Sequence, residues 1–296
     1  DDKIIKKMKE EGKSLEEITT FYIKNYKNDM EILNILPNSF EPKATENLDA
    51  MKEMIENLLS KDIAYKTDDS VYFDVSKDKN YGSLSNQASD ENSQARVEIN
   101  NQKRNSSDFA LWKFEKASDV SFASNFGAGR PGWHIECSAM IEKHLAYKDE
   151  PFQIDIHCGG ADLLFPHHEN EIAQSEAATG KKYVNYWMHA GAVRVDNEKM
   201  SKSLGNFFTI REILDKYHAE IVRFFLISSH YRSAINYSED NLKEAKAGLE
   251  RFYKCLLGHE TIAPLSLEQL QKTAVYAEFA QVMNDDFNVR EAIAVM

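Results

Sequence analysis

Apolar residues follow a helical spacing along the first part of the chain. Between residues 3 and 35 they recur at steps of three and four, and Gly12 interrupts the pattern, so we expect two amphipathic helices there. Pro37 and Pro42 then bound a loop, after which residues 44–59 return to the helical spacing. The N-terminal part is therefore predicted to be helical.

The spacing changes after this third helix. Residues 71–75 read Val-Tyr-Phe-Asp-Val, which predicts a strand. Residues 83–108 are rich in Ser, Asn, Gln and charged side chains. We expect them to form a mobile insertion loop, because nothing in the stretch is able to bury a core.

Strand and helix alternate in the middle of the chain. The predicted order is helix, strand, helix, strand, over residues 133–145, 152–157, 166–178 and 185–189. This alternation is typical of an α/β protein with a parallel sheet. Ligands of such sheets bind at the carboxyl ends of the strands, where His157 and His189 would lie.

Amphipathic helices return after residue 205. We expect them over residues 210–217, 219–228 and 238–257, followed by a linker that contains Pro264 and by a further helical segment from residue 267 onward.

Size, charge and cysteine content narrow the class of protein. A chain of 296 residues corresponds to roughly two domains. Its 48 acidic against 36 basic side chains exclude binding of nucleic acid by bulk charge, although local basic patches are compatible with them. The longest run without a charged residue covers residues 183–193, too short for a membrane helix. Three scattered cysteines and a charged start without a signal-peptide core favour a cytoplasmic location.

Metal-binding residue types gather between residues 127 and 205. Six of the nine histidines, two of the three cysteines and eight of the twelve glycines lie there. His167 and Glu171 are four apart on one predicted helix face, and Cys137 on the preceding helix would add a thiolate, a set that favours zinc. Alternatively, His167 and Glu171 are a surface pair and Cys137 is a small buried apolar residue. Three further ligand candidates remain open: His157, Cys158 and His168.

A second candidate lies in a loop between residues 196 and 206. Lys199 and Lys202 alternate there with the hydroxyl groups of Ser201 and Ser203, and such a loop is able to hold a polyphosphate. The alternative is a solvated surface loop. A glycine-rich turn over residues 127–132 precedes Trp133 and permits close approach of its backbone to a ligand. The alternative is a tight turn of purely structural role.

These stretches together closely resemble one enzyme family, the cysteinyl-tRNA synthetases of class I. The matching strings are GRPGWHIECSAM at residues 129–140, FPHHENEIAQS at 165–175 and KMSKSLGNF at 199–207, supported by DDKIIK at the start and HYRSAINYSEDNL at 230–242. KMSKS alone marks many class I synthetases, but the combination with the other two strings is highly specific. The resemblance spans essentially the whole chain.

The resemblance implies an α/β, Rossmann-type nucleotide-binding fold with a connective insertion, followed by a helical stem and anticodon region. In the implied domain order, residues 1–43 are the remainder of the first half of the catalytic domain and residues 44–128 are the connective insertion. Residues 129–206 are the second catalytic half, with the zinc site and the KMSKS loop. Residues 207–260 are the stem-contact helices, and residues 261–296 begin a tRNA-binding helical domain. The family's His-Ile-Gly-His signature and a further zinc-ligand cysteine lie upstream of DDKIIK and are not in this sequence.

The resemblance also implies an activity. The family activates L-cysteine with ATP, with Mg²⁺ expected, to cysteinyl adenylate, and transfers the cysteinyl group to the 3′ end of tRNA(Cys); we expect a monomer. By the family's pattern Cys137, His167 and Glu171 hold one zinc ion per chain. The implied ATP site comprises Lys199, Ser201, Lys202, Ser203 and His189, with Lys199 and Lys202 as the catalytic pair, and the implied cysteine site comprises Trp133, His157 and Asp162.

Zinc chemistry agrees with this interpretation, because zinc binds a thiolate far better than the neutral hydroxyl of serine. A site built on one specific polar group reaches about 10⁴- to 10⁵-fold discrimination, so we expect no editing domain. One departure from the family is Cys158, where members usually carry glycine. Two other hypotheses are a cysteine ligase of mycothiol synthesis, which shares the adenylating core, and a structural zinc-binding module without catalysis.

Overall fold

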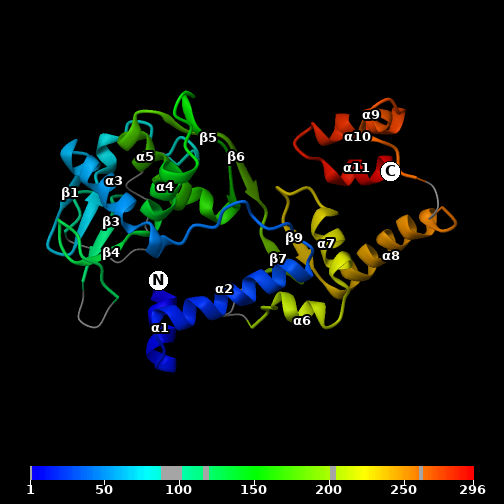
Figure 1. Ribbon diagram of the computed structural model, residues 1–296, viewed down its shortest axis with the longest axis horizontal. Coiled ribbons are helices and arrows are strands. Elements are labelled where there is room, and N and C mark those ends of the chain that lie inside the picture. Colours follow the sequence, from blue (N-terminus) through cyan, green and yellow to red (C-terminus); the bar gives the residue numbers. More distant parts are fainter. Residues whose placement is uncertain (1, 88–101, 116–119, 201–204, 260–262) are drawn as a thin grey trace. The chain divides into compact units, whose positions relative to one another are not determined.

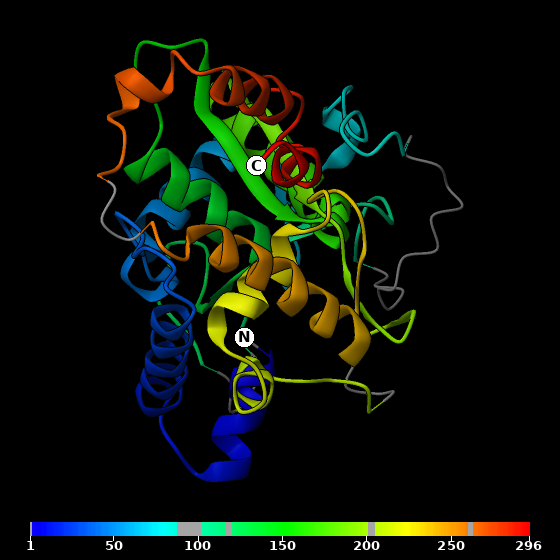
Figure 2. The ribbon, with the colours of Figure 1, turned by 90° about the vertical axis from the view of Figure 1, so that its right-hand side faces the viewer.

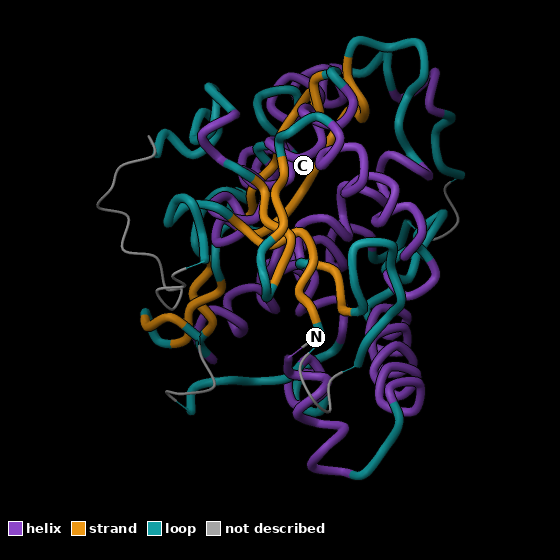
Figure 3. Tube along the Cα trace, turned by 90° about the vertical axis from the view of Figure 1, so that its left-hand side faces the viewer, coloured by secondary structure: helices purple, strands orange, loops and turns teal. Residues whose placement is uncertain are grey.

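The computed structural model describes residues 2–87, 102–115, 120–200, 205–259 and 263–296 (Figure 1). The chain divides into two compact units. The first unit contains residues 1–15 and 38–188, and the second contains residues 16–37 and 189–296. Figure 3 distinguishes the helices, strands and connections within them. Within the described ranges, no helix combines the length and apolar character needed to cross a membrane.

The first unit is built on a four-stranded antiparallel sheet and three helices. Its strands follow the order of the sequence, with adjacent strands paired: β1 (Ala64–Lys66), β2 (Ser70–Phe73), β3 (Phe109–Phe114) and β4 (Gly129–Pro131). The helices that share a hydrophobic core with this sheet are α3 (Leu48–Ser60), α4 (Trp133–His144) and α5 (Glu169–Thr179). Trp112, Phe73 and Ile55 are among the fully buried side chains of that core. A short helix, α1 (Asp2–Glu11), belongs to the same unit.

A second pair of strands carries the region where the sequence predicts α/β alternation. β5 (Phe152–Gly160) and β6 (Lys182–Ala190) are hydrogen-bonded neighbours, with α5 between them in the chain. Ile154, Tyr183 and Val184 form a small core that packs against apolar side chains of α4 and α5. The predicted helix at 133–145 and the predicted strands at 152–157 and 185–189 are therefore confirmed.

The start of α5 differs from the prediction. Residues Leu164–His168 form a separate π-type turn that contains a cis Phe165–Pro166 peptide bond, and the α-helix begins at Glu169. Pro166 is therefore not the first residue of the helix. The reason is local, because Phe165 has extended backbone angles that interrupt a continuous helix.

The second unit is mainly helical. Its helices are α2 (Leu15–Ile32), α6 (Ile210–Leu214), α7 (Ala219–Ile227), α8 (Glu239–Leu256), α9 (Leu267–Leu270), α10 (Ala274–Met283) and α11 (Val289–Val295). Figure 2 shows α7 beside α8, and Phe225 on α7 packs with Leu242 and Ala245 on α8. Arg223 ties α7 to the end of α2 by donating hydrogen bonds to the carbonyls of Leu33 and Asn34.

A small sheet completes the second unit. β7 (Val193–Val195) pairs in parallel with β9 (Ile235–Tyr237) and antiparallel with β8 (Glu198–Lys199). β8 carries the first lysine of the predicted polyphosphate loop, although residues 201–204 lie outside the described ranges.

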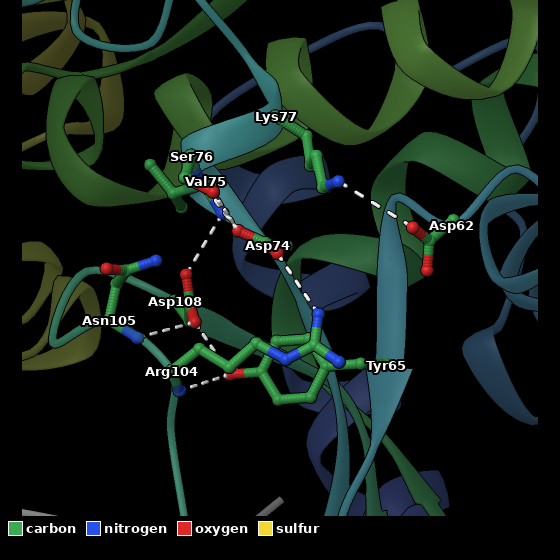
Figure 4. Close-up of polar contacts among 9 residues, drawn as sticks. All are labelled: Asp62, Tyr65, Asp74, Val75, Ser76, Lys77, Arg104, Asn105 and Asp108. Atoms are coloured by element: carbon green, nitrogen blue, oxygen red, sulfur yellow. Dashed lines mark hydrogen bonds and ion pairs between the residues drawn. The ribbon is translucent and has the colours of Figure 1, made fainter.

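The predicted insertion loop is more ordered at its C-terminal end than the sequence suggests. Asp108 is almost fully buried, and its carboxylate accepts hydrogen bonds from the Tyr65 hydroxyl at 2.6 Å, the Val75 amide at 3.0 Å and the Asn105 amide at 2.9 Å (Figure 4). The Arg104 guanidinium lies 4.1 Å from the centre of the Tyr65 ring. A buried carboxylate, not apolar side chains, holds this end of the loop, and the sequence did not predict the burial of Asp108.

Loss of the Asp108 carboxylate is expected to destabilise the first unit. Burial, and then the adjacent carboxylate, raise the pKa of Tyr65, so its hydroxyl stays protonated and donates. Asp108→Ala leaves this hydroxyl and two backbone amides without their acceptor, and we expect the free energy of unfolding to fall by about 3 kcal/mol. Denaturant titration followed by tryptophan fluorescence measures this directly, because all three tryptophans belong to the first unit.

A matched control is the exposed tyrosine–aspartate pair of the same unit. The Tyr147 hydroxyl donates to Asp155 at the surface, and Asp155→Ala is expected to cost less than about 1 kcal/mol. Equal effects of the two substitutions would contradict the role assigned to Asp108.

Candidate metal centre

Three side chains, from α4, from the turn before α5 and from α5 itself, converge in the first unit. Cys137 projects from the first half of α4, His167 lies in the turn before α5, and Glu171 lies in the first turn of α5. The Cys137 Sγ is 3.7 Å from the His167 Nε2, which is 2.6 Å from the Glu171 Oε1. Ligand atoms of all three lie within 4.8 Å of one another. A thiolate, an imidazole and a carboxylate in this arrangement suit zinc.

The Glu171 carboxylate is the most deeply buried member of this group. Glu171 has no exposed surface, and a buried carboxylate is costly unless partners compensate its charge. Its Oε2 accepts a hydrogen bond from the Tyr183 hydroxyl at 3.0 Å and lies 3.4 Å from the His157 Nε2. Its Oε1 faces His167 without making an aligned hydrogen bond. This oxygen and the facing nitrogen are thus oriented as two ligands of one cation, which is the fit that zinc requires.

The Cys137 thiol has a high pKa in this setting. Burial is the main cause, and the nearby Glu171 carboxylate raises the pKa of the thiol further. The thiol therefore carries its proton at neutral pH until a cation displaces that proton.

His134 supports His167 from behind. The Nδ1 atoms of the two imidazoles are 2.8 Å apart, so one ring donates and the other accepts. Burial lowers the pKa of His134 to about 3, which keeps it neutral at physiological pH. If the Nε2 of His167 offers its lone pair to a cation, the Nδ1 of the same ring carries the proton and donates to His134. Such contacts fix the tautomer and orientation of metal-binding histidines.

The structure places the other predicted site residues as follows. The Trp133 ring is largely exposed and lies 4.2 Å, centre to centre, from the His167 ring. Asp162 is exposed in the 3₁₀ turn Ala161–Leu163 that follows β5. His157, near the end of β5, reaches Glu171 as described above. The cysteine-site candidates Trp133 and His157 thus border the metal group.

The predicted ATP residues are not brought together in the part of the chain that the structure describes. His189 lies in the second unit, near the end of β6. Lys199 is placed in β8 by its backbone alone, while Ser201, Lys202 and Ser203 lie outside the described residues. Cys158 is exposed on β5 and does not belong to either metal-binding group found among the described residues.

Sequence reasoning missed three residues that shape the site. His134 and Tyr183 contact side chains of the metal group from other elements of the fold. Glu169 belongs to α5 and connects this helix to the insertion. The Glu169 carboxylate, almost fully buried, accepts hydrogen bonds from the amides of Gly82 and Ser85, both at 2.9 Å. Only the crowding of polar residues in the string FPHHENE hinted at this role.

Comparisons with known proteins define the class. A family model described as the catalytic domain of tRNA synthetases class I (C) matches residues 1–247. The fold is that of solved class I synthetases. Methionyl-tRNA synthetase from Mycobacterium tuberculosis in complex with methionyl-adenylate aligns over 99% of this chain and 71% of its own, with a TM-score of 0.67 at 13% identity. A putative arginyl-tRNA synthetase from Campylobacter jejuni aligns over 95% and 60%, with a TM-score of 0.54 at 12% identity.

The particular family follows from the match over most of the chain: this chain belongs to the class I (C) tRNA synthetase family. Curated relatives named cysteine–tRNA ligase come from Aliarcobacter butzleri, 58% identical over 296 residues, and from Nitratiruptor, 53% identical over 301 residues. Both alignments cover all of this chain. The chain spans 62% and 63% of the length of these two relatives.

Weakening the Glu169 carboxylate is expected to loosen the insertion beside the metal group. Glu169→Gln removes the charge and one acceptor oxygen, and hydrogen bonds to a charged group contribute about 1.5–3 kcal/mol. Amide hydrogen exchange at Gly82 and Ser85 should therefore accelerate about 10- to 100-fold. Glu176→Gln on the same helix is the control, because Glu176 accepts only from the Tyr183 amide among the backbone bonds described. Unchanged exchange at residues 82 and 85 in Glu169→Gln would contradict this assignment.

Proposed function

We propose that this chain is the catalytic part of a cysteine–tRNA ligase. It activates L-cysteine with ATP to cysteinyl adenylate and transfers the cysteinyl group to the 3′ end of tRNA(Cys). The observation that carries the proposal is the convergence of Cys137, His167 and Glu171 beside the exposed ring of Trp133. The names of the curated relatives support it.

Selection of cysteine follows from the donor set. Zinc, held by Cys137, His167 and Glu171, supplies a Lewis acid that prefers the thiolate of cysteine to the hydroxyl of serine. Around this position Trp133 offers a flat face to the substrate, His157 borders it, and the exposed Asp162 carboxylate is available to the substrate's ammonium group. His134 holds the imidazole of His167 in one tautomer.

Activation of cysteine requires compensation of the charge that develops on the leaving pyrophosphate. In our proposal Lys199 and Lys202 supply the compensating positive charge. Ser201 and Ser203 are hydroxyl donors, and His189 lies near the adenylate. Mg²⁺ accompanies ATP. The catalytic core is interrupted in sequence by the insertion at residues 44–128. After the core, residues 207–260 serve as the stem-contact helices and residues 261–296 as the start of the tRNA-binding region. The enzyme acts as a monomer.

Cysteine-dependent exchange of labelled pyrophosphate into ATP tests the function. The protein at its natural full length is expected to catalyse the exchange with cysteine and not with serine. Lys202→Ala is expected to slow the exchange about 100-fold while cysteine binding stays nearly unchanged, because a lost charge-stabilising donor costs that much. Lys272→Ala, at an exposed position just after α9, is the control. A zinc-loaded protein without exchange would be a structural zinc module instead.

Removing the proposed thiolate ligand tests the metal centre. Cys137→Ser is expected to lower zinc affinity by more than the roughly 10- to 100-fold that loss of an outer partner costs, and to weaken cysteine binding with it. Zinc content by elemental analysis and cysteine affinity by calorimetry measure the two effects. Cys255→Ser, exposed on α8, should change neither. Unchanged zinc affinity together with unchanged cysteine affinity in Cys137→Ser would remove Cys137 from the ligand set.

A further inference from the structure

A second group of metal-binding side chains lies beside the first. Ligand atoms of His157, His168 and Glu171 also lie within 4.8 Å of one another. They come from β5, from the turn before α5 and from α5 itself. His168 is almost fully buried, and the side chain of His157 is 14% exposed. The group is therefore enclosed, with one partly accessible member.

Glu171 belongs to both groups and presents one oxygen to each. Its Oε1 is 2.6 Å from the His167 Nε2, and its Oε2 is 3.4 Å from the His157 Nε2. Carboxylates that divide their oxygens in this way bridge the ions of two-metal sites, which lie about 3.5–4 Å apart. The Tyr183 hydroxyl donates a hydrogen bond to Oε2, and this bond uses only one of the lone pairs of the carboxylate oxygen.

The two histidines of the second group are held in place by their surroundings. Their rings meet edge to face, with centroids 4.8 Å apart, and the Trp187 ring lies 4.9 Å from each of them. Gly159 makes room for His168, since a Cβ at this position would lie 2.5 Å from its Cε1 and 2.9 Å from its Nε2. The backbone of β5 thus admits the His168 ring only because residue 159 is glycine.

We propose that His157, His168 and Glu171 form a second divalent-cation site, which fills after the Cys137 site and shares Glu171 with it. Two imidazoles and a carboxylate suit zinc, cobalt or nickel better than magnesium or calcium. The second ion binds more weakly, because this group has no thiolate and Glu171 is already engaged by the first ion. The inference concerns metal binding alone and rests on the proposed metal centre, not on catalysis.

Titration of the metal-free, full-length protein with Co²⁺ tests the proposal. The first ion is expected to give a thiolate-to-cobalt charge-transfer band, and the second is expected to add d–d absorption without enlarging that band. Equilibrium dialysis should then find two ions per chain. A single ion at saturation would overturn the proposal, and pyrophosphate exchange in the zinc-loaded protein reports separately on the proposed function.

Variants assign the second ion to its ligands. His168→Gln and Gly159→Ala should each reduce the stoichiometry from two ions to one and keep the charge-transfer band, whereas His144→Gln, on the surface end of α4, should retain both ions. Cys137→Ser should lose the band and still bind an ion through the second group. Retention of two ions in both His168→Gln and Gly159→Ala would place the second ion elsewhere and overturn the assignment.

Discussion

The buried carboxylate of Glu171 is the constraint on which the site depends. An ionised carboxylate without solvent contact is stable only when surrounding groups compensate its charge. Here the Tyr183 hydroxyl on β6 donates to one oxygen, beside which His157 of β5 lies, and the other oxygen faces His167 without a hydrogen bond, where a cation would complete the compensation. Removal of the Tyr183 hydroxyl would take away the hydrogen bond that the buried carboxylate accepts. The demand of one carboxylate therefore fixes the relative positions of a helix and two strands.

The helix that carries Glu171 also connects the site to the insertion. Three consecutive residues of α5 serve three purposes: Glu169 accepts amides of the insertion, Asn170 accepts the Tyr81 hydroxyl, and Glu171 faces the metal group. The polar loop at residues 83–108 offers little apolar surface for packing. Two buried carboxylates hold the ends of this loop instead by accepting hydrogen bonds from backbone amides: Glu169 accepts from Ser85, and Asp108 accepts from Asn105. Charge thus replaces apolar packing where the sequence is most polar.

Local signals were enough to predict much of this arrangement. The helix at α4, the strands β5 and β6 and the i, i+4 spacing of His167 and Glu171 follow from short-range periodicity and spacing. Tyr183 and His134 were not predictable, because their contacts depend on how strands and helices from separate parts of the chain pack. The burial of Asp108 was not predicted, because its sequence neighbours are those of a surface loop. The start of α5 at Glu169 was equally hidden, since the extended conformation of Phe165 leaves no mark in the spacing.

Anomalous diffraction at the zinc absorption edge, from crystals of the zinc-loaded protein, decides whether these three side chains hold zinc. We expect a strong peak within bonding distance of the Cys137 Sγ, an imidazole nitrogen of His167 and a carboxylate oxygen of Glu171. A zinc-saturated crystal with no peak at these three atoms, or with its strongest peak on other residues, would contradict it.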